Sequence, residues 1–261
     1  MRILMIGDIV GRSGRKAVKE TLTTIRQELK LDMIIANGEN AASGNGITSE
    51  IARELLNYGI DVLTMGNHVW DRKEAIPYIG KEPRILRPAN YPPGTPGKGS
   101  GIYCVNGIDV GVVNLSGRVY LSNLECPFRL ADELINGLHD KTNIICVDFH
   151  AEATSEKVAL GWYLDGKVSA VVGTHTHIQT ADERVLPGGT AYITDIGMTG
   201  PHDSVIGVKT DLVLQKFTTQ MPVRFEVADG PYQFNAVVVE VDTETGKAES
   251  IERVYNVEYS D

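Results

Sequence analysis

The sequence predicts an α/β fold in which parallel strands alternate with helices. The first observation is a series of short, nearly continuous apolar runs, which are typical of strands buried on both faces. The second is that stretches with helical spacing of apolar residues separate these runs. The third is that the connections are short, which implies a parallel sheet with right-handed crossovers. We predict that residues 1–261 form a single domain.

The first part of the chain shows this alternation most clearly. Ser13 is a candidate N-cap for a helix that runs to about Lys30. A second helix is expected to start at Thr48 or Ser49 and to stop at Gly59. The expected strands around these helices lie at residues 2–7, 32–36 and 60–65.

The second part adds a hairpin, two more helix–strand units and a region rich in strands. Asn106-Gly107 fits a type I′ turn, and a loop precedes the hairpin at residues 92–101. From Arg184 onward the chain reads mainly as β, with one further helix near 210–217. The remaining strands are expected at 102–105, 108–114, 144–149 and 168–172, and helices near 128–138 and 155–163.

Composition excludes several classes of function. The net charge of −9 argues against a long nucleic acid or an anionic membrane as partner, because both reward a basic surface. The three cysteines form no C-x-x-C pair and are expected to be reduced thiols. The apolar run before Gly7-Asp8 is too short for the core of a signal peptide. We therefore expect a cytoplasmic protein with no membrane partner, and we expect a homo-oligomer.

Metal-ligand side chains follow five of the expected strands. The carboxyl ends of strands in open α/β sheets line one crevice, so these side chains are expected to meet there. An extended segment would place His175 and His177, two residues apart, on the same side. These strand ends carry Asp8, Glu39 with Asn40, Asn67 with His68, His150, and His175 with His177.

Each of these side chains has an ordinary explanation when taken alone. A strand-end acid such as Asp8 often caps the next helix, and a lone His150 is more often structural than a ligand. Glu39 is harder to explain as a cap because a loop separates it from the next helix. The joint occurrence at five strand ends favours a site for two metal ions.

Two other functions remain open at this point. Gly7, Gly11 and Gly14 follow the first strand, and Glu39 ends the second, as in a dinucleotide-binding oxidoreductase. The spacing is G-x-x-x-G-x-x-G rather than G-x-G-x-x-G, and that function leaves the imidazoles unexplained. The other alternative is a metal-binding regulatory protein with little turnover.

The same residues resemble, in order, the motif blocks of the calcineurin-like metallophosphoesterases. That family usually shows D-x-H, G-D, G-N-H-[DE], H and G-H-x-H. This sequence has Val10 in place of the first histidine and Glu39 in place of the bridging aspartate, and both departures look like the YmdB branch of the superfamily. The resemblance implies an α/β sandwich of mixed sheets flanked by helices.

The resemblance also implies a role for each residue. Glu39 would bridge two metal ions. Asp8, Asn40 and His177 would complete one metal site, with Asn40 in place of the histidine missing at position 10. The other site would be completed by Asn67, His150 and His175. Oxygen and nitrogen ligands are compatible with iron, manganese or zinc, and the YmdB branch favours iron.

The expected activity is hydrolysis of small phosphodiesters. These include cyclic nucleotides, among them the 2′,3′-cyclic nucleotides. RNA-related diesters are less favoured because of the acidic charge. A hydroxide bridging the two metal ions would attack phosphorus, and His68 would protonate the leaving oxygen as general acid. The alternative for His68 is a further ligand, or a residue that orients one.

Overall fold

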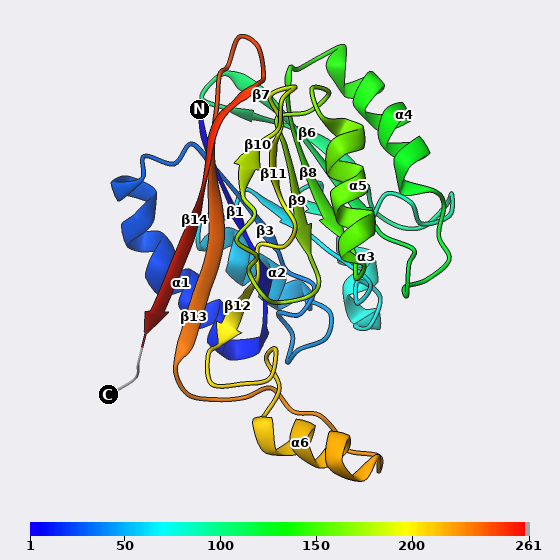
Figure 1. Cartoon of the computed structure of the whole chain (residues 1–261), viewed down its shortest axis with the longest axis vertical. Helices are drawn as coiled ribbons and strands as arrows, with labels where there is room; N and C mark the ends of the chain where they lie inside the picture. The colour runs from blue at the N-terminus through cyan, green and yellow to red at the C-terminus, as the bar shows by residue number, and fades with distance from the viewer. Residues whose placement is uncertain (259–261) are drawn as a thin grey trace.

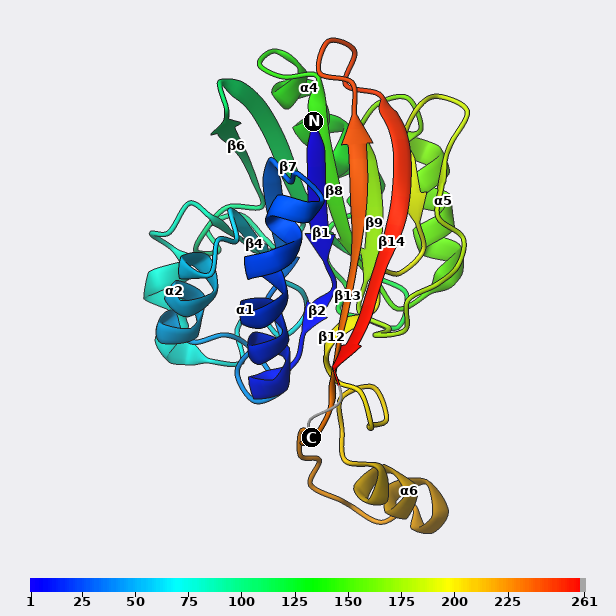
Figure 2. The ribbon, with the colours of Figure 1, turned by 90° about the vertical axis from the view of Figure 1, so that its left-hand side faces the viewer.

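The computed structural model describes residues 1–258, and its strands form two sheets packed face to face with helices on their outer sides (Figures 1 and 2). The first sheet has eight strands in the order β2-β12-β13-β1-β3-β4-β5, with β14 paired to β13. Its strands are β1 (Arg2–Ile6), β2 (Asp8–Ile9), β3 (Met33–Asn37), β4 (Val62–Thr64), β5 (Ile85–Leu86), β12 (Met198–Pro201), β13 (Tyr232–Val241) and β14 (Ala248–Glu258).

The second sheet has six strands in the order β10-β11-β9-β8-β7-β6. They are β6 (Ser100–Val105), β7 (Ile108–Ser116), β8 (Ile144–His150), β9 (Ala170–Thr174), β10 (Arg184–Val185) and β11 (Ala191–Ile193). Each sheet has a parallel centre and antiparallel neighbours, as in the β1–β13 and β6–β7 pairs. The prediction of mixed sheets flanked by helices is therefore confirmed.

The helices lie on the outer faces of both sheets, except α6, which projects away from them (Figure 2). They are α1 (Gly11–Glu28), α2 (Ser49–Asn57), α3 (Ile76–Ile79), α4 (Pro127–His139), α5 (Thr154–Leu164) and α6 (Thr210–Thr219), with a 3₁₀ turn at Lys73–Ala75. α1 and α2 pack on the first sheet, and α4 and α5 on the second. None of the helices within residues 1–258 is long and apolar enough to cross a membrane.

The alternation of side chains along β1 explains its continuous apolar run. Ile3 and Met5 point into the core between the two sheets, whereas Leu4 and Ile6 point into the core beneath α1 and α2. A strand between two apolar layers buries both of its faces, so no polar residue interrupts it. The inter-sheet core draws on strands from both ends of the chain, from Ile3 to Ile251.

Local signals in the sequence were right in part. Thr48 caps α2, and its hydroxyl accepts a hydrogen bond from the Ile51 backbone N–H at 3.2 Å. Asn106 and Gly107 both have positive φ, as a type I′ turn requires. The assignment of Ser13 as N-cap was wrong, because α1 begins at Gly11 and its N-cap, Val10, makes no side-chain cap bond.

Residues 202–231, here called the arm, connect β12 to β13 and leave the body of the molecule. The predicted helix near 210–217 is α6, which both views place away from the sheets (Figures 1 and 2). Leu214 and Phe217 on this helix are largely exposed. The arm returns through Val208 and Val227, which form a β-bridge.

We propose that the chain folds as one domain, because one apolar layer is shared by both sheets. Ile35 lies in that layer and is 1% exposed. Ile35→Ala is expected to lower the free energy of unfolding by about 2–5 kcal/mol. Near- and far-ultraviolet circular dichroism should report a single, coincident transition at a lower temperature.

Leu214→Ala, at an exposed position on α6, is the control and should change stability by less than about 0.5 kcal/mol. Two separate transitions in the Ile35→Ala variant would contradict a single cooperative domain.

Candidate metal centre

The predicted ligands lie together at the carboxyl ends of strands from both sheets. β1, β3 and β4 of the first sheet lead into Asp8, Glu39 with Asn40, and Asn67. β8 of the second sheet ends at His150, and the turn after β9 carries His175 and His177. The contacts described below, together with a distance of 3.8 Å between Asp8 Oδ1 and His150 Nδ1, join all seven of these side chains into one cluster.

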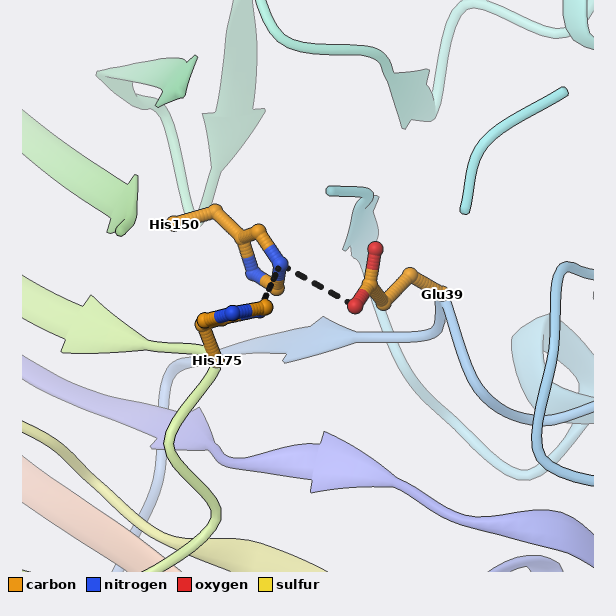
Figure 3. A group of neighbouring side chains, drawn as sticks. All are labelled: Glu39, His150 and His175. Carbon is orange, nitrogen blue, oxygen red and sulfur yellow. Dashed lines mark hydrogen bonds and ion pairs between the residues drawn. The ribbon is translucent and has the colours of Figure 1, made fainter. Parts of the chain in front are cut away.

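One half of the cluster is centred on the His150 ring. Its Nε2 atom lies 3.0 Å from Glu39 Oε1, from Asn67 Oδ1 and from His175 Nδ1. Glu39, His150 and His175 each offer a ligand atom within 4.8 Å of the others (Figure 3). One ring proton cannot satisfy three such neighbours, whereas a cation accepts lone pairs from all of them.

The other half of the cluster lies around Asp8, Asn40 and His177. The Asn40 amide lies 3.2 Å from Glu39 Oε1 and 3.2 Å from His177 Nε2. Rotating this amide about its terminal torsion would exchange its oxygen and nitrogen at those positions. The Asp8 carboxyl is fully buried, and within residues 1–258 its Oδ1 atom has no hydrogen-bond partner. An orphaned carboxylate oxygen beside an imidazole fits a cation.

The His150 ring is oriented by a hydrogen-bond chain behind it. Thr174 donates its hydroxyl proton to Asp148 Oδ1 at 2.8 Å, so it accepts from His150 Nδ1 at 2.9 Å. Asp148 is buried and also accepts from Thr64 and Asn37. This chain places the proton on Nδ1 and aims the Nε2 lone pair at the cluster.

The other two imidazoles are held in the same way. His175 Nε2 lies 3.0 Å from a Glu152 carboxylate oxygen, and His177 Nδ1 donates to the Ile206 carbonyl at 2.9 Å. In each ring the second nitrogen, His175 Nδ1 or His177 Nε2, faces the cluster. Three rings with outward N–H groups and inward lone pairs are the donor set that a metal ion requires.

The backbone of the loop that carries His175 and His177 differs from the prediction. The segment is not extended: φ is +101° at His175 and +67° at His177, which costs of order 1–3 kcal/mol at each residue. Asp8 Oδ2 accepts from the His175 backbone N–H at 3.0 Å, and Asp195 accepts from both the backbone and the hydroxyl of Thr176. The Lys157 ammonium, 2.6 Å from Asp195, completes a buried ion pair behind the loop.

The electrostatics of the cluster favour a bound cation. Burial raises the pKa of Asp8 to about 6, although the His177 and His150 imidazoles act to lower it. Burial also acts to raise the pKa of Glu39, but the interactions with His150 and His68 together outweigh it and lower that pKa to about 2. Burial acts to lower the pKa of His150, but Glu39 raises it to about 9, whereas burial and His150 lower the pKa of His175 to about 3. Metal binding would displace the proton that His150 otherwise shares with Glu39.

Position 10 is used for packing. Val10 is 3% exposed, and its side chain lies against Gly200 and Gly207: a Cβ added at these glycines would approach it to 2.9 Å and 3.0 Å. The site therefore contains no ligand at position 10, and the Asn40 amide, 3.2 Å from His177 Nε2, is a polar group in the half of the cluster that the histidine would have served.

His68 lies at the edge of the cluster, and sequence reasoning missed its partner. Its backbone N–H donates to Glu39 Oε2 at 3.0 Å, and its Nδ1 atom lies 2.8 Å from Asp71 Oδ2. The ring is partly exposed and lines a cavity of about 450 Å³ beside the cluster. The family pattern G-N-H-[DE] gave no signal for this pair, because its acid would fall at position 69, which is Val69 here; the carboxylate that contacts the ring comes two residues later.

Comparison with known proteins places this geometry in context. The family model described as YmdB-like protein matches residues 4–254. A 2′,3′-cyclic-nucleotide 2′-phosphodiesterase of Bacillus subtilis (strain 168) is 53% identical over 254 residues, covering 97% of this chain and 96% of the relative.

Two solved structures share the fold over nearly the whole length of both chains. A hypothetical protein from Thermus thermophilus has a TM-score of 0.93 and 43% identity, covering 99% of this chain and 100% of the other. A phosphatase from Mycoplasma pneumoniae has a TM-score of 0.94 and 35% identity, covering 99% of this chain and 94% of the other.

Gly66 provides a test of the cluster that changes no ligand. A Cβ at this position would lie 2.3 Å from both Glu39 Oε2 and His150 Nε2, so both side chains would have to move. Gly66→Ala is therefore expected to lose most of its bound metal while keeping the fold, as measured by elemental analysis and circular dichroism.

Gly137→Ala in α4 is the matched control, because a Cβ there meets no atom within 4 Å. It should retain the metal content of the unsubstituted protein. Full metal stoichiometry in Gly66→Ala would mean that Glu39 and His150 do not bind metal together.

Proposed function

This chain belongs to the YmdB-like family, a branch of the calcineurin-like phosphoesterases, and on that premise we propose that it is a dinuclear-metal phosphodiesterase acting on 2′,3′-cyclic nucleotides. It is a phosphoric-ester hydrolase, as are its named relatives. The finer assignment to cyclic diesters draws support from the Bacillus subtilis relative, whose name specifies that reaction.

One observation carries the proposal: the convergence of ligand atoms around His150 and Glu39. Three ligand-type atoms lie 3.0 Å from His150 Nε2, and the Asn40 amide, which also contacts His177, lies 3.2 Å from the same Glu39 carboxylate. Two groups of ligands that share one carboxylate support a pair of ions bridged by Glu39. The bound ions would supply a more acidic water nucleophile and would neutralise phosphoryl charge.

His68 is proposed as the general acid. Asp71 accepts from Nδ1, which leaves Nε2 as the nitrogen that can face a substrate in the cavity. A water that has released one proton to solvent adds to phosphorus as hydroxide, and the bond from phosphorus to O2′ breaks. His68 gives its proton to the departing O2′ and regains one from solvent. The product is a nucleoside 3′-phosphate. The bond from the His68 backbone to Glu39 fixes the distance between acid and metal ligands.

Other features of the structure account for the glycines that suggested a dinucleotide site. A Cβ on Gly7 would lie 2.0 Å from the Gly197 carbonyl oxygen, and one on Gly14 would lie 2.3 Å from the Thr199 carbonyl oxygen. These glycines allow the β1–α1 turn to pack against the segment around β12, and Glu39 faces imidazoles. Neither observation favours an oxidoreductase.

The identity of the metals is also part of the proposal. Carboxylate, amide and imidazole ligands without thiolate suit iron, manganese or zinc, and iron is favoured by resemblance to the YmdB branch. Elemental analysis of protein purified without added metal tests both identity and stoichiometry. A stoichiometry of one ion per chain would contradict the dinuclear assignment.

The substrate class is tested with three compounds: 2′,3′-cyclic AMP, bis-p-nitrophenyl phosphate and p-nitrophenyl phosphate. The metal-loaded protein is expected to hydrolyse both diesters and to release adenosine 3′-phosphate from the first, as resolved by chromatography. Hydrolysis of the monoester alone would overturn the diesterase proposal. No turnover of any of the three would favour the metal-binding regulator.

The role of His68 is tested by His68→Ala. The side chain contacts Asp71 and lines the cavity, so its loss is expected to lower kcat by about 10²- to 10⁴-fold with metal content unchanged. His139→Ala, at an exposed histidine at the end of α4, should leave kcat unchanged. Loss of metal in His68→Ala would instead make His68 a ligand.

A further inference from the structure

The cavity beside the cluster has two chemically different walls. One is polar and carries the cluster residues Glu39, His175 and His177 together with His68. The other belongs to the arm and is apolar; its residues are Val205, Ile206, Val208, Val213, Phe217, Phe225 and Val227. The cavity, at about 450 Å³, falls within the size range of pockets for small molecules.

Two aromatic rings on the arm are left open to solvent. Phe217 is 69% exposed and Phe225 is 50% exposed, although both line the cavity. Val213 and Phe217 lie four residues apart, so they share one side of α6. A ligand with a flat, weakly polar surface would bind favourably to these aromatic faces beside a phosphate site, because it would remove them from water.

The base of the arm is fixed against the cluster, so the apolar wall has a defined position. The Lys209 backbone N–H donates to the Glu226 carbonyl at 3.0 Å, and the Ala228 backbone N–H donates to the Gly207 carbonyl at 2.9 Å. The Ile206 carbonyl accepts from the predicted ligand His177.

Close steric contacts reinforce that position. Val227 packs against Gly11 and Gly44, where an added Cβ would come within 3.0 Å and 2.9 Å of it. The arm therefore contacts the body through two residues that line the cavity: Val227 packs at the β1–α1 turn, and the Ile206 carbonyl accepts from His177.

We propose that the arm forms the nucleobase subsite, with Phe217 and Phe225 covering the base of a cyclic nucleotide whose phosphate lies at the cluster. This inference rests on the proposed function, because it needs the phosphate at the metal ligands. A nucleotide carries a charged phosphate at one end and a flat π surface at the other, which matches the two walls.

Among the arm residues that line the cavity, the charged side chain is Glu226, and it is already paired with Lys209 at 2.8 Å. The other arm residues that line the cavity are apolar or glycine. Recognition therefore comes from stacking, which every base can provide. The subsite distinguishes nucleotides from diesters without a base, and it discriminates little among the four bases.

The test compares a substrate that has a base with one that lacks it. Stacking on one aromatic residue is worth about 5- to 150-fold in affinity. Phe217→Ala is expected to raise KM for 2′,3′-cyclic AMP by about tenfold. Its kcat should remain within about twofold, and kinetics with glycerol 1,2-cyclic phosphate should not change. Calorimetric titration with adenosine 3′-phosphate should show the same loss of affinity without any turnover.

Matched variants separate stacking from other effects. Leu214→Ala and Met221→Ala remove exposed apolar side chains of the arm that lie outside the cavity, and both should behave like the unsubstituted protein. Phe217→Trp should restore binding, whereas Phe217→Leu should not. A Phe217→Leu variant with unchanged affinity would overturn base stacking in favour of an alkyl chain on this wall.

Other outcomes would overturn the subsite alone. A role in base binding would be excluded if Phe217→Ala and Phe225→Ala raised KM equally for the substrate with a base and the substrate without one. It would also be excluded if neither variant changed KM for either substrate. If the unsubstituted protein hydrolyses neither cyclic substrate, the proposed function fails. The titration with adenosine 3′-phosphate still decides whether the arm binds a nucleotide.

Discussion

The structure depends on the cost of burying negative charge at the ends of its central strands. Asp8 and Glu39 are both almost completely shielded from water, and burial alone would make either carboxylate unfavourable. The imidazoles of His150 and His177 offset that cost in the protein alone, and cations between these groups would offset it further. The layers of strand and helix hold these charges in one place.

Much of this arrangement is predictable because it follows from strand geometry. Strands buried on both faces read as apolar runs, and their carboxyl ends meet at one edge, so the polar residues that follow can be expected to converge. The two-sheet sandwich was accessible only by resemblance. Nothing in the periodicity indicates that β13, near the end of the chain, pairs with β1.

The remaining features depend on contacts that local sequence patterns do not encode. Positive φ is uncommon at residues other than glycine, so the backbone at His175 and His177 could not be anticipated. The loop donates backbone hydrogen bonds from His175 to Asp8 and from Thr176 to Asp195. The sequence places Asp148 two residues before His150, but the contacts that hold it behind that ring come from the fold. The outward projection of α6 could not be predicted either, because a short helical pattern does not indicate which part of the protein the helix packs against.

The contact between His177 and the Ile206 carbonyl has an evolutionary consequence. The acceptor is a main-chain atom, so no change of side chain at position 206 can delete it. The arm can therefore vary in sequence, and with it the kind of molecule it admits, while the imidazole keeps its orientation. A change in the path of the chain, such as an insertion or deletion between β12 and α6, would remove this contact. Substitutions can thus change the apolar wall of the cavity while the orientation of His177 on the polar wall is kept.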